Sequence, residues 1–240
     1  MKKLLSLLLT LCMILAPSIT VFAEMEDYPE IEFFWPITVP VQKSDWYYSA
    51  ACDMWEKYDR LFSFHFSADR NVTRIDLTAY MMAMDNDWWA FQPTFEPNPF
   101  TDLDAYHDNE DVIEMIDWAY NLDIIEGVSD TEFAPDGYLT REQLAVFLYR
   151  LSNQFMIYRN FSDQYDNVDI ETKASIDTFP DADEVGEFAT EAVMWAYGTG
   201  LMIGKGTPEG VYFAPKDTLT HAELLNVMYR YTKYFNVEMY

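Results

Sequence analysis

Three stretches of the chain repeat one pattern of apolar and polar positions, in which a threonine precedes apolar residues spaced i, i+3, i+4 and i+7. This spacing places the apolar side chains on one face of an α-helix. Three residues after each threonine stands Asp76, Gln143 or Glu223, which completes a capping box at the start of the helix. The pattern predicts helices after Thr73, Thr140 and Thr220, with core faces made by Leu77, Tyr80, Met81 and Met84, by Leu144, Phe147, Leu148 and Leu151, and by Leu224, Val227, Met228 and Tyr231.

The same order of short motifs surrounds these helices. Residues 100–151 and 179–231 each contain Phe-x-Asp, Trp-Ala-Tyr, a glycine, Phe-Ala-Pro and the threonine, at nearly equal spacing. Residues 44–84 carry a degenerate copy that lacks the glycine. Ordered anchors at a constant spacing indicate internal repetition. Each copy also predicts a first helix, and we place these helices at 46–58, 111–121 and 187–198.

One repeat cannot bury the apolar face of its second helix alone, so the three copies should share one core. The sequence therefore predicts an all-α fold, in which three helix–loop–helix repeats pack as a pseudo-threefold helical bundle. Gly200 follows the first helix predicted in the third repeat, and glycine suits the left-handed conformation in which many helices end. Asp123 occupies the matching position in the second repeat, which predicts a less well formed helix end there.

The first 23 residues have the pattern of a secretory signal peptide, with Lys2 and Lys3 before an apolar run and Ala23 at the expected cleavage site. The run of about 12 apolar residues is too short to span a bilayer, which takes about 20. Residues 24–43 are acidic and contain prolines, which predicts an extended lead-in. Cleavage would leave Cys52 as the single cysteine, which excludes an internal disulfide.

The chain has 15 Lys and Arg residues against 41 Asp and Glu residues, a formal charge of −26. Such an acidic surface repels polyphosphate, so nucleic acid is excluded as a partner. No polybasic cluster exists for docking on anionic lipid, and we expect no membrane association after signal cleavage. Half of the residues are hydrophobic, which is enough for packed domains.

The repeated motifs resemble the S-layer homology (SLH) family, whose repeats read roughly as Phe-x-Asp, Trp-Ala, a glycine, Phe-x-Pro and Thr-Arg-Ala-Glu. Residues 100–151 and 179–231 match this order well, and residues 44–84 match it as a degenerate first repeat. The resemblance implies a three-pronged helical bundle. It also implies non-covalent attachment to secondary polymers linked to peptidoglycan, which are often pyruvylated.

The resemblance also implies a set of carbohydrate-binding residues. A helix N-terminus attracts anions, and an arginine at its first position adds a fork of donors that fits a carboxylate. Here His221 replaces the family's arginine in the third repeat, and the first repeat lacks the glycine loop, so the groove near Arg141 is the leading candidate. The second repeat departs from the family too, because Glu142 places a negative charge beside Arg141. The implied residues are Arg74 and Arg141 for the carboxylate, Gly127 and Gly204 for close approach of a sugar, Asp102 and Asp181 for sugar hydroxyls, and His221 at the substituted position.

Enzyme signatures are absent from the sequence: it has no nucleophile-elbow, zinc-protease or phosphate-loop motif. The acidic segment from Asp102 to Asp111 lacks the spacing of a calcium loop, so we expect neither a metal site nor a cofactor. The leading hypothesis is a secreted, non-catalytic protein that binds an anionic wall polysaccharide at the cell surface. The alternatives are a module that binds another surface protein through SLH repeats that no longer hold glycan, and a hydrolase that acts on the wall.

Overall fold

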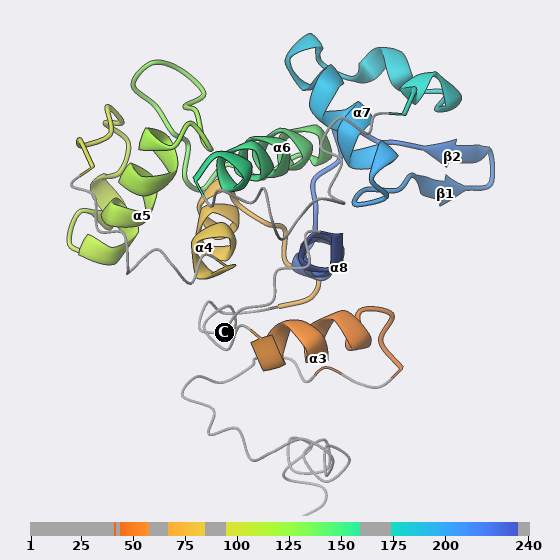
Figure 1. The fold of residues 1–240 in the computed structure, drawn as a ribbon, viewed down its shortest axis with the longest axis horizontal. Helices are drawn as coiled ribbons and strands as arrows, with labels where there is room; N and C mark the ends of the chain where they lie inside the picture. The colour runs from red at the N-terminus through yellow and green to blue at the C-terminus, as the bar shows by residue number, and fades with distance from the viewer. Residues whose placement is uncertain (1–40, 42–43, 58–66, 85–94, 159–173, 235–240) are drawn as a thin grey trace, which may run out of the picture.

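We describe a computed structural model of the chain, in which residues 41, 44–57, 67–84, 95–158 and 174–234 can be described. The predicted signal peptide and nearly all of the predicted lead-in lie outside these residues. The described part contains six α-helices, joined by short 3₁₀ turns and loops (Figure 1). The helices are α3 (Tyr48–Lys57), α4 (Arg74–Met84), α5 (Glu110–Asn121), α6 (Arg141–Tyr158), α7 (Thr190–Gly198) and α8 (His221–Tyr234).

The second helix of each repeat begins where the capping box predicts. In each box the threonine hydroxyl accepts the backbone amide of the third helical residue, and the side chain of that residue accepts the threonine amide. The apolar faces predicted for α4, α6 and α8 are buried, apart from Met84, whose side chain is outside the described residues. The start signals and the core faces are therefore confirmed.

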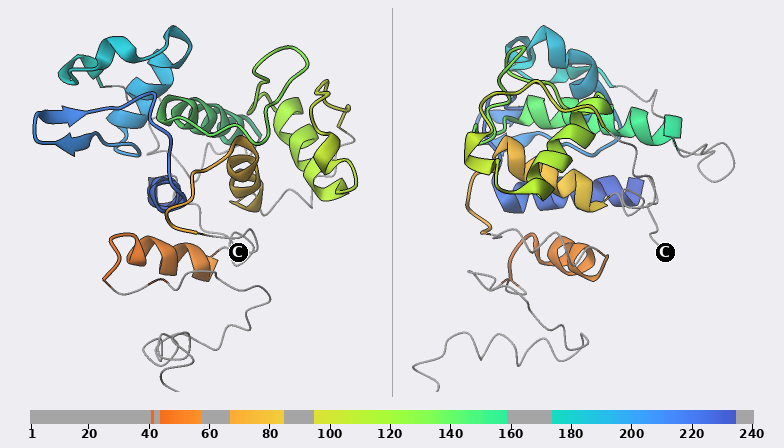
Figure 2. Two further views of the ribbon diagram at one scale, coloured as in Figure 1. Left: turned by 180° about the vertical axis from the view of Figure 1, so that it is seen from behind. Right: turned by 90° about the vertical axis from the view of Figure 1, so that its left-hand side faces the viewer.

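Each first helix packs against the second helix of the preceding repeat rather than its own. Helix α5 packs on α4, α7 packs on α6, and α3 packs on α8, which closes the order into a circle. Figure 1 shows these three pairs around the middle of the molecule, and Figure 2 shows the same pairing from two further sides. The first and last described helices thus belong to one pair, although they stand at opposite ends of the chain.

A closed ring of backbone hydrogen bonds joins the three repeats just before their second helices. Val72 N donates to Leu219 O at 2.8 Å, Leu219 N donates to Leu139 O at 3.3 Å, and Leu139 N donates to Val72 O at 2.9 Å. All three side chains are fully buried. The threefold relation expected from the repeats therefore exists at this ring as direct backbone pairing.

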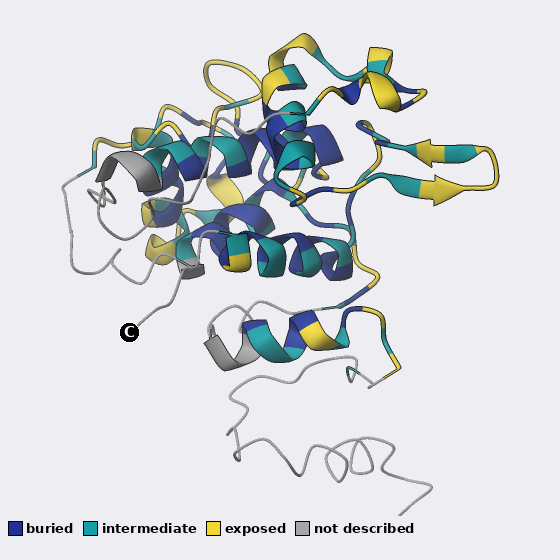
Figure 3. Ribbon diagram, turned by 45° about the vertical axis from the view of Figure 1, so that its right-hand side comes forward, coloured by how far each residue is buried: buried dark blue, intermediate teal, exposed yellow. Residues whose placement is uncertain are grey.

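The prediction of a purely α-helical fold needs a correction. Strands β1 (Lys205–Thr207) and β2 (Gly210–Tyr212) pair as an antiparallel hairpin in the third repeat. The hairpin contains the loop that is three residues longer than its counterpart in the second repeat. Figure 3 shows that its residues are exposed or intermediate, whereas the buried positions gather on the helices. The fold is predominantly helical, with one small sheet at its edge.

The helix ends differ from the prediction at one position. Gly200 adopts the expected left-handed conformation, with φ of 74°, and Asp123 at the matching position does so too, with φ of 54°. The amide of Asp123 donates to Tyr120 O at 3.0 Å, as the amide of Gly200 does to Tyr197 O. The two helices therefore end alike, even though one of them lacks glycine. Within the described residues, no helix combines the length and the apolar character that a membrane span requires.

Candidate functional site

The two aspartates of the Phe-x-Asp motifs hold the backbone of the Phe-Ala-Pro loops. Asp102 accepts the amides of Phe133 at 2.9 Å and Ala134 at 2.7 Å. Asp181 binds the equivalent amides of Phe213 and Ala214 at 3.0 and 2.6 Å. Both alanines have φ near +56°, which is an unfavourable conformation for alanine. Each carboxylate therefore fixes a strained turn, and both of its oxygens are engaged by the protein.

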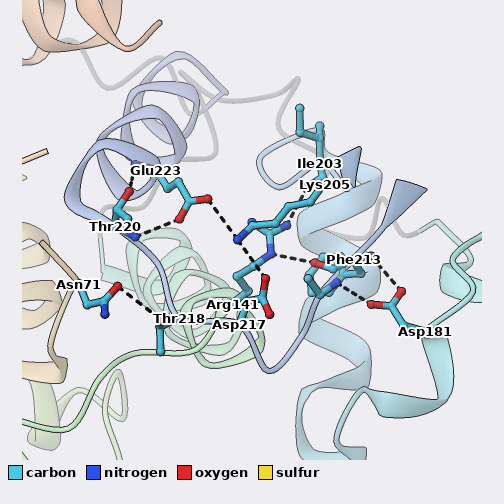
Figure 4. A network of polar contacts seen from close by, with 11 residues as sticks. Asn71, Arg141, Asp181, Ile203, Lys205, Phe213, Asp217, Thr218, Thr220 and Glu223 are labelled. Atoms are coloured by element: carbon cyan, nitrogen blue, oxygen red, sulfur yellow. Dashed lines mark hydrogen bonds and ion pairs between the residues drawn. The ribbon is translucent and has the colours of Figure 1, made fainter. Parts of the chain in front are cut away.

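The arginines that open α4 and α6 point into the loop of the next repeat. Arg141 Nε donates to Phe213 O at 2.8 Å, and its Nη2 donates to Ile203 O at 2.7 Å (Figure 4). Arg74 repeats this arrangement with Phe133 O at 2.7 Å and Glu126 O at 2.6 Å. Both side chains are 5% exposed. Among the described residues, Nη1 of each guanidinium has no hydrogen-bond partner.

Both guanidinium groups remain charged at neutral pH, although burial lowers their pKa values. Desolvation lowers the pKa of Arg74 to about 10, with a smaller opposing effect from the charge of Asp102. Desolvation also lowers the pKa of Arg141, against the charges of Glu223, Asp217 and other neighbours. Arg74 lies 4.7 Å from the centre of the Phe133 ring, which adds a cation–π contact. Each arginine is therefore a buried cation that carbonyl oxygens and an aromatic ring stabilise.

The amides at the starts of α4, α6 and α8 are not free to bind an anion, contrary to the sequence argument. The next repeat supplies two carbonyl acceptors to each helix, in the circular order of the fold, and the capping threonine takes the third amide. The contacts are Arg74 N to Gly137 O and Ile75 N to Pro135 O, Arg141 N to Asp217 O and Glu142 N to Pro215 O, and His221 N to Arg70 O and Ala222 N to Ala68 O. The helix starts are thus repeat–repeat contacts, which we name the first, second and third junctions in that order.

The third junction has its own chemistry, because His221 replaces the arginine and is fully buried. Its Nε2 lies 3.4 Å from Asp76 Oδ2, and its Nδ1 lies 3.3 Å from the Tyr80 hydroxyl. Arg70 forms an ion pair with the other oxygen of Asp76 at 3.1 Å. The histidine therefore joins two repeats through a carboxylate, where the arginines join them through carbonyl groups.

The two loop glycines, Gly127 and Gly204, lie against other atoms of the chain. A Cβ atom on Gly127 would lie 2.2 Å from Ser129 O, and one on Gly204 would lie 2.4 Å from Val211 Cγ1. The contact of Gly127 is with backbone, so its loop requires glycine where it folds back on itself. A Cβ atom on Gly204 would require the neighbouring side chains to move. Trp118 and Trp195 of the Trp-Ala-Tyr motifs are buried and belong to the core.

The second junction brings together charged residues that the sequence prediction did not single out. Lys205, on β1, forms ion pairs with Asp217 and Glu223, each at 3.2 Å. Figure 4 shows these residues beside the contacts of Arg141. The first junction has Val128 at the position of Lys205, counted from the aligned glycines, and Val128 is 56% exposed. The sequence does contain a sign of this difference, because the longer loop of the third repeat has lysine where the loop of the second repeat has valine.

The second junction also contains the carboxylate of Glu142, which follows Arg141 in the sequence. Glu142 is buried and accepts a hydrogen bond from Gly186 N at 2.9 Å. It also forms an ion pair with Lys216, so its negative charge is compensated locally. Of the predicted site residues, the structure brings Arg141, Asp181 and Gly204 together here. It places Arg74, Asp102 and Gly127 at the first junction and His221 at the third.

Comparison with known proteins gives one family. The model of the S-layer homology domain matches residues 99–145 and 178–225, which coincide with the second and third predicted repeats. No curated protein matches the chain. SLH domains are binding modules of cell walls and cell surfaces. The matched segments contain the aspartates, glycines and loops described above, together with Arg141 and His221. The chain therefore contains two S-layer homology domains, at residues 99–145 and 178–225.

Proposed function

We propose that the protein is a secreted, non-catalytic attachment protein that binds an anionic, carboxylate-bearing polysaccharide of the cell wall at the second junction. The family supports binding to cell-wall polymers in general. The observation that carries the finer proposal is the clustering of Arg141 and Lys205 at one junction of an acidic chain. A sugar carboxylate would there meet unused N–H donors of both cations, between the carboxylates of Asp217 and Glu223. The first junction offers Arg74 and the exposed Val128.

In this proposal the predicted site residues have different roles. Arg141 offers its remaining Nη1 atom to the ligand, while its other donors hold the loop in place. Asp181 and Gly204 shape the same loop and act on binding through its backbone. Arg74, Asp102 and Gly127 shape the first junction in the same way, and His221 joins the third repeat to the first.

The proposal is tested by sedimentation of the full chain with purified cell walls. We expect retention on walls that carry a pyruvylated polymer, and weak retention on walls from which the pyruvyl groups or the whole polymer have been removed. The high net negative charge of the chain serves as an internal control, because it opposes unspecific adhesion to an anionic wall. Equal retention on intact and stripped walls would contradict the proposal.

A second candidate function is supported by the use of the arginine donors inside the fold. Arg74 and Arg141 each give two groups to carbonyl oxygens of their own chain. If the remaining donors are too few for a glycan, the chain would be a surface module that binds another protein. This candidate predicts no sedimentation with either kind of wall, together with a stable complex of the chain with a surface protein.

A further inference from the structure

At the second junction, the side chain of Lys205 is more exposed than that of Arg141, the cation expected from the family. The side chain of Lys205 is 31% exposed, whereas Arg141 is 5% exposed. A ligand that arrives from solvent therefore meets the ammonium group of Lys205 before it meets the guanidinium of Arg141. The guanidinium beneath it is held by Phe213 O and Ile203 O.

The ion pairs of Lys205 leave it able to accept a new partner. Its ammonium group has three N–H donors, and the contacts within the described residues use two, to Asp217 and Glu223. Both distances are 3.2 Å, longer than the about 2.7–2.9 Å of a strong charge-assisted hydrogen bond. The two carboxylates therefore aim the ammonium group without saturating it.

The same two carboxylates connect Lys205 to Arg141. The charges of Glu223 and Asp217 act on Arg141 and oppose the lowering of its pKa, and Asp217 O accepts the backbone amide of Arg141. An anion bound at Lys205 would therefore lie within the electrostatic neighbourhood of the guanidinium. The unused N–H donor of Lys205 would make a charge-assisted hydrogen bond to a carboxylate, which is stronger than a hydrogen bond to a neutral hydroxyl.

We propose that Lys205 is the specificity-determining residue of the second junction, which distinguishes sugars that carry a carboxylate from neutral ones. This inference rests on the proposed function. In it, Arg141 is a positioning residue for the loop that presents the lysine. The first junction, with Val128 at the matching place, would lack this discrimination.

The test measures, by calorimetry, binding of a pyruvylated wall-polysaccharide fragment and of the same fragment after mild acid removal of pyruvate. Lys205→Gln should weaken binding of the pyruvylated fragment about 10- to 100-fold, the size of one lost charge-assisted contact, and leave the other fragment unaffected. Lys205→Arg should retain most of the affinity. Melting temperatures close to that of the parent would exclude loss of fold as the cause.

Two control variants carry matched charge changes. Lys233→Gln removes a lysine that is paired with Asp53 in the last turn of α8, outside the second junction, and should leave the affinity unchanged. Asp108→Asn, added to Lys205→Gln, restores the net charge at an exposed position before α5 and should not restore the affinity.

Unchanged affinity in Lys205→Gln would overturn the inference and leave the proposed function standing, provided that the parent binds the pyruvylated fragment. Equal losses in Lys205→Gln and Lys233→Gln, or rescue by Asp108→Asn, would overturn it as well, because net charge would then explain the binding. A parent chain that binds neither fragment would overturn both the inference and the proposed function.

Discussion

At the scale of single residues, Arg141 stabilises the fold through contacts within the chain, independently of any ligand. Its side chain is buried and supplies hydrogen bonds to two carbonyl groups of the next repeat. Removal of the side chain leaves those acceptors buried and unpaired. Loss of wall binding in an arginine-to-alanine variant therefore needs a stability measurement beside it before it can be assigned to the ligand.

The residue-scale prediction is that Arg141→Ala lowers the free energy of unfolding by about 2–5 kcal/mol, because two acceptors lose their donors and a packed side chain is lost. Arg74→Ala should cost a similar amount, since its contacts are equivalent. Urea unfolding followed by circular dichroism measures both. Arg150→Ala is the control: its ion pair with Glu126 is at the surface, and its loss should cost about 1 kcal/mol or less. Equal costs for Arg141 and Arg150 would contradict the structural role.

At the scale of elements, the helix starts were predictable from sequence, whereas the contacts between repeats were not. A capping box is local, so Thr140 and Gln143 identify the start of α6 without knowledge of the rest of the fold. The partners of Arg141 lie more than 60 residues away and depend on how the repeats close. The hairpin escaped prediction because each strand has three residues and glycines occur in both.

The candidate site, too, was predictable from the sequence only in part. The sequence identified the positions of Asp102, Asp181, Gly127 and Gly204 through the motif, and in the structure all four shape the loops of the first and second junctions. It did not reveal that the carboxylates hold amides, because those amides lie about 30 residues further along the chain. Lys205 was overlooked because its carboxylate partners come from two other segments.

The capping box of α4 gives a prediction at the element scale. Burial alone would raise the pKa of Asp76, but its contact with His221 and its hydrogen bonds with Thr73 lower the pKa to about 2 from an ordinary 3.8. A lowered pKa means that the ionised carboxylate stabilises the fold. This contribution is complete above about pH 4 and is lost as the pH falls towards 2.

Asp76→Asn should therefore lower the free energy of unfolding by about 2 kcal/mol at pH 6, and the difference from the parent should fade by pH 2. Urea unfolding at several pH values measures this. Asp69→Asn removes the same charge from an exposed neighbouring position and reports the general effect of charge. A difference between parent and Asp76→Asn that does not change with pH would show that the carboxylate does not act through its ionised form.

At the scale of the whole molecule, the circular order of the helix pairs sets the cooperativity. An open array of repeats can fray from its ends, because each repeat contacts only its neighbours along the chain. Here α3 packs on α8, and the backbone ring includes all three repeats. The first helix thus stabilises the last one across more than 160 residues of chain.

The prediction at this scale concerns Met54, which is fully buried on α3. Met54→Ala should lower the stability by about 2–5 kcal/mol and shift a single unfolding transition as a whole. Hydrogen exchange should speed up in α8 as well as in α3, because the two helices form one pair. Ile116→Ala in α5 is the matched control and should loosen α4 before α8. If α3 instead melted in a separate early transition that left the exchange of α8 unchanged, the circle of repeats would not be a cooperative unit, and the second and third repeats would stand on their own.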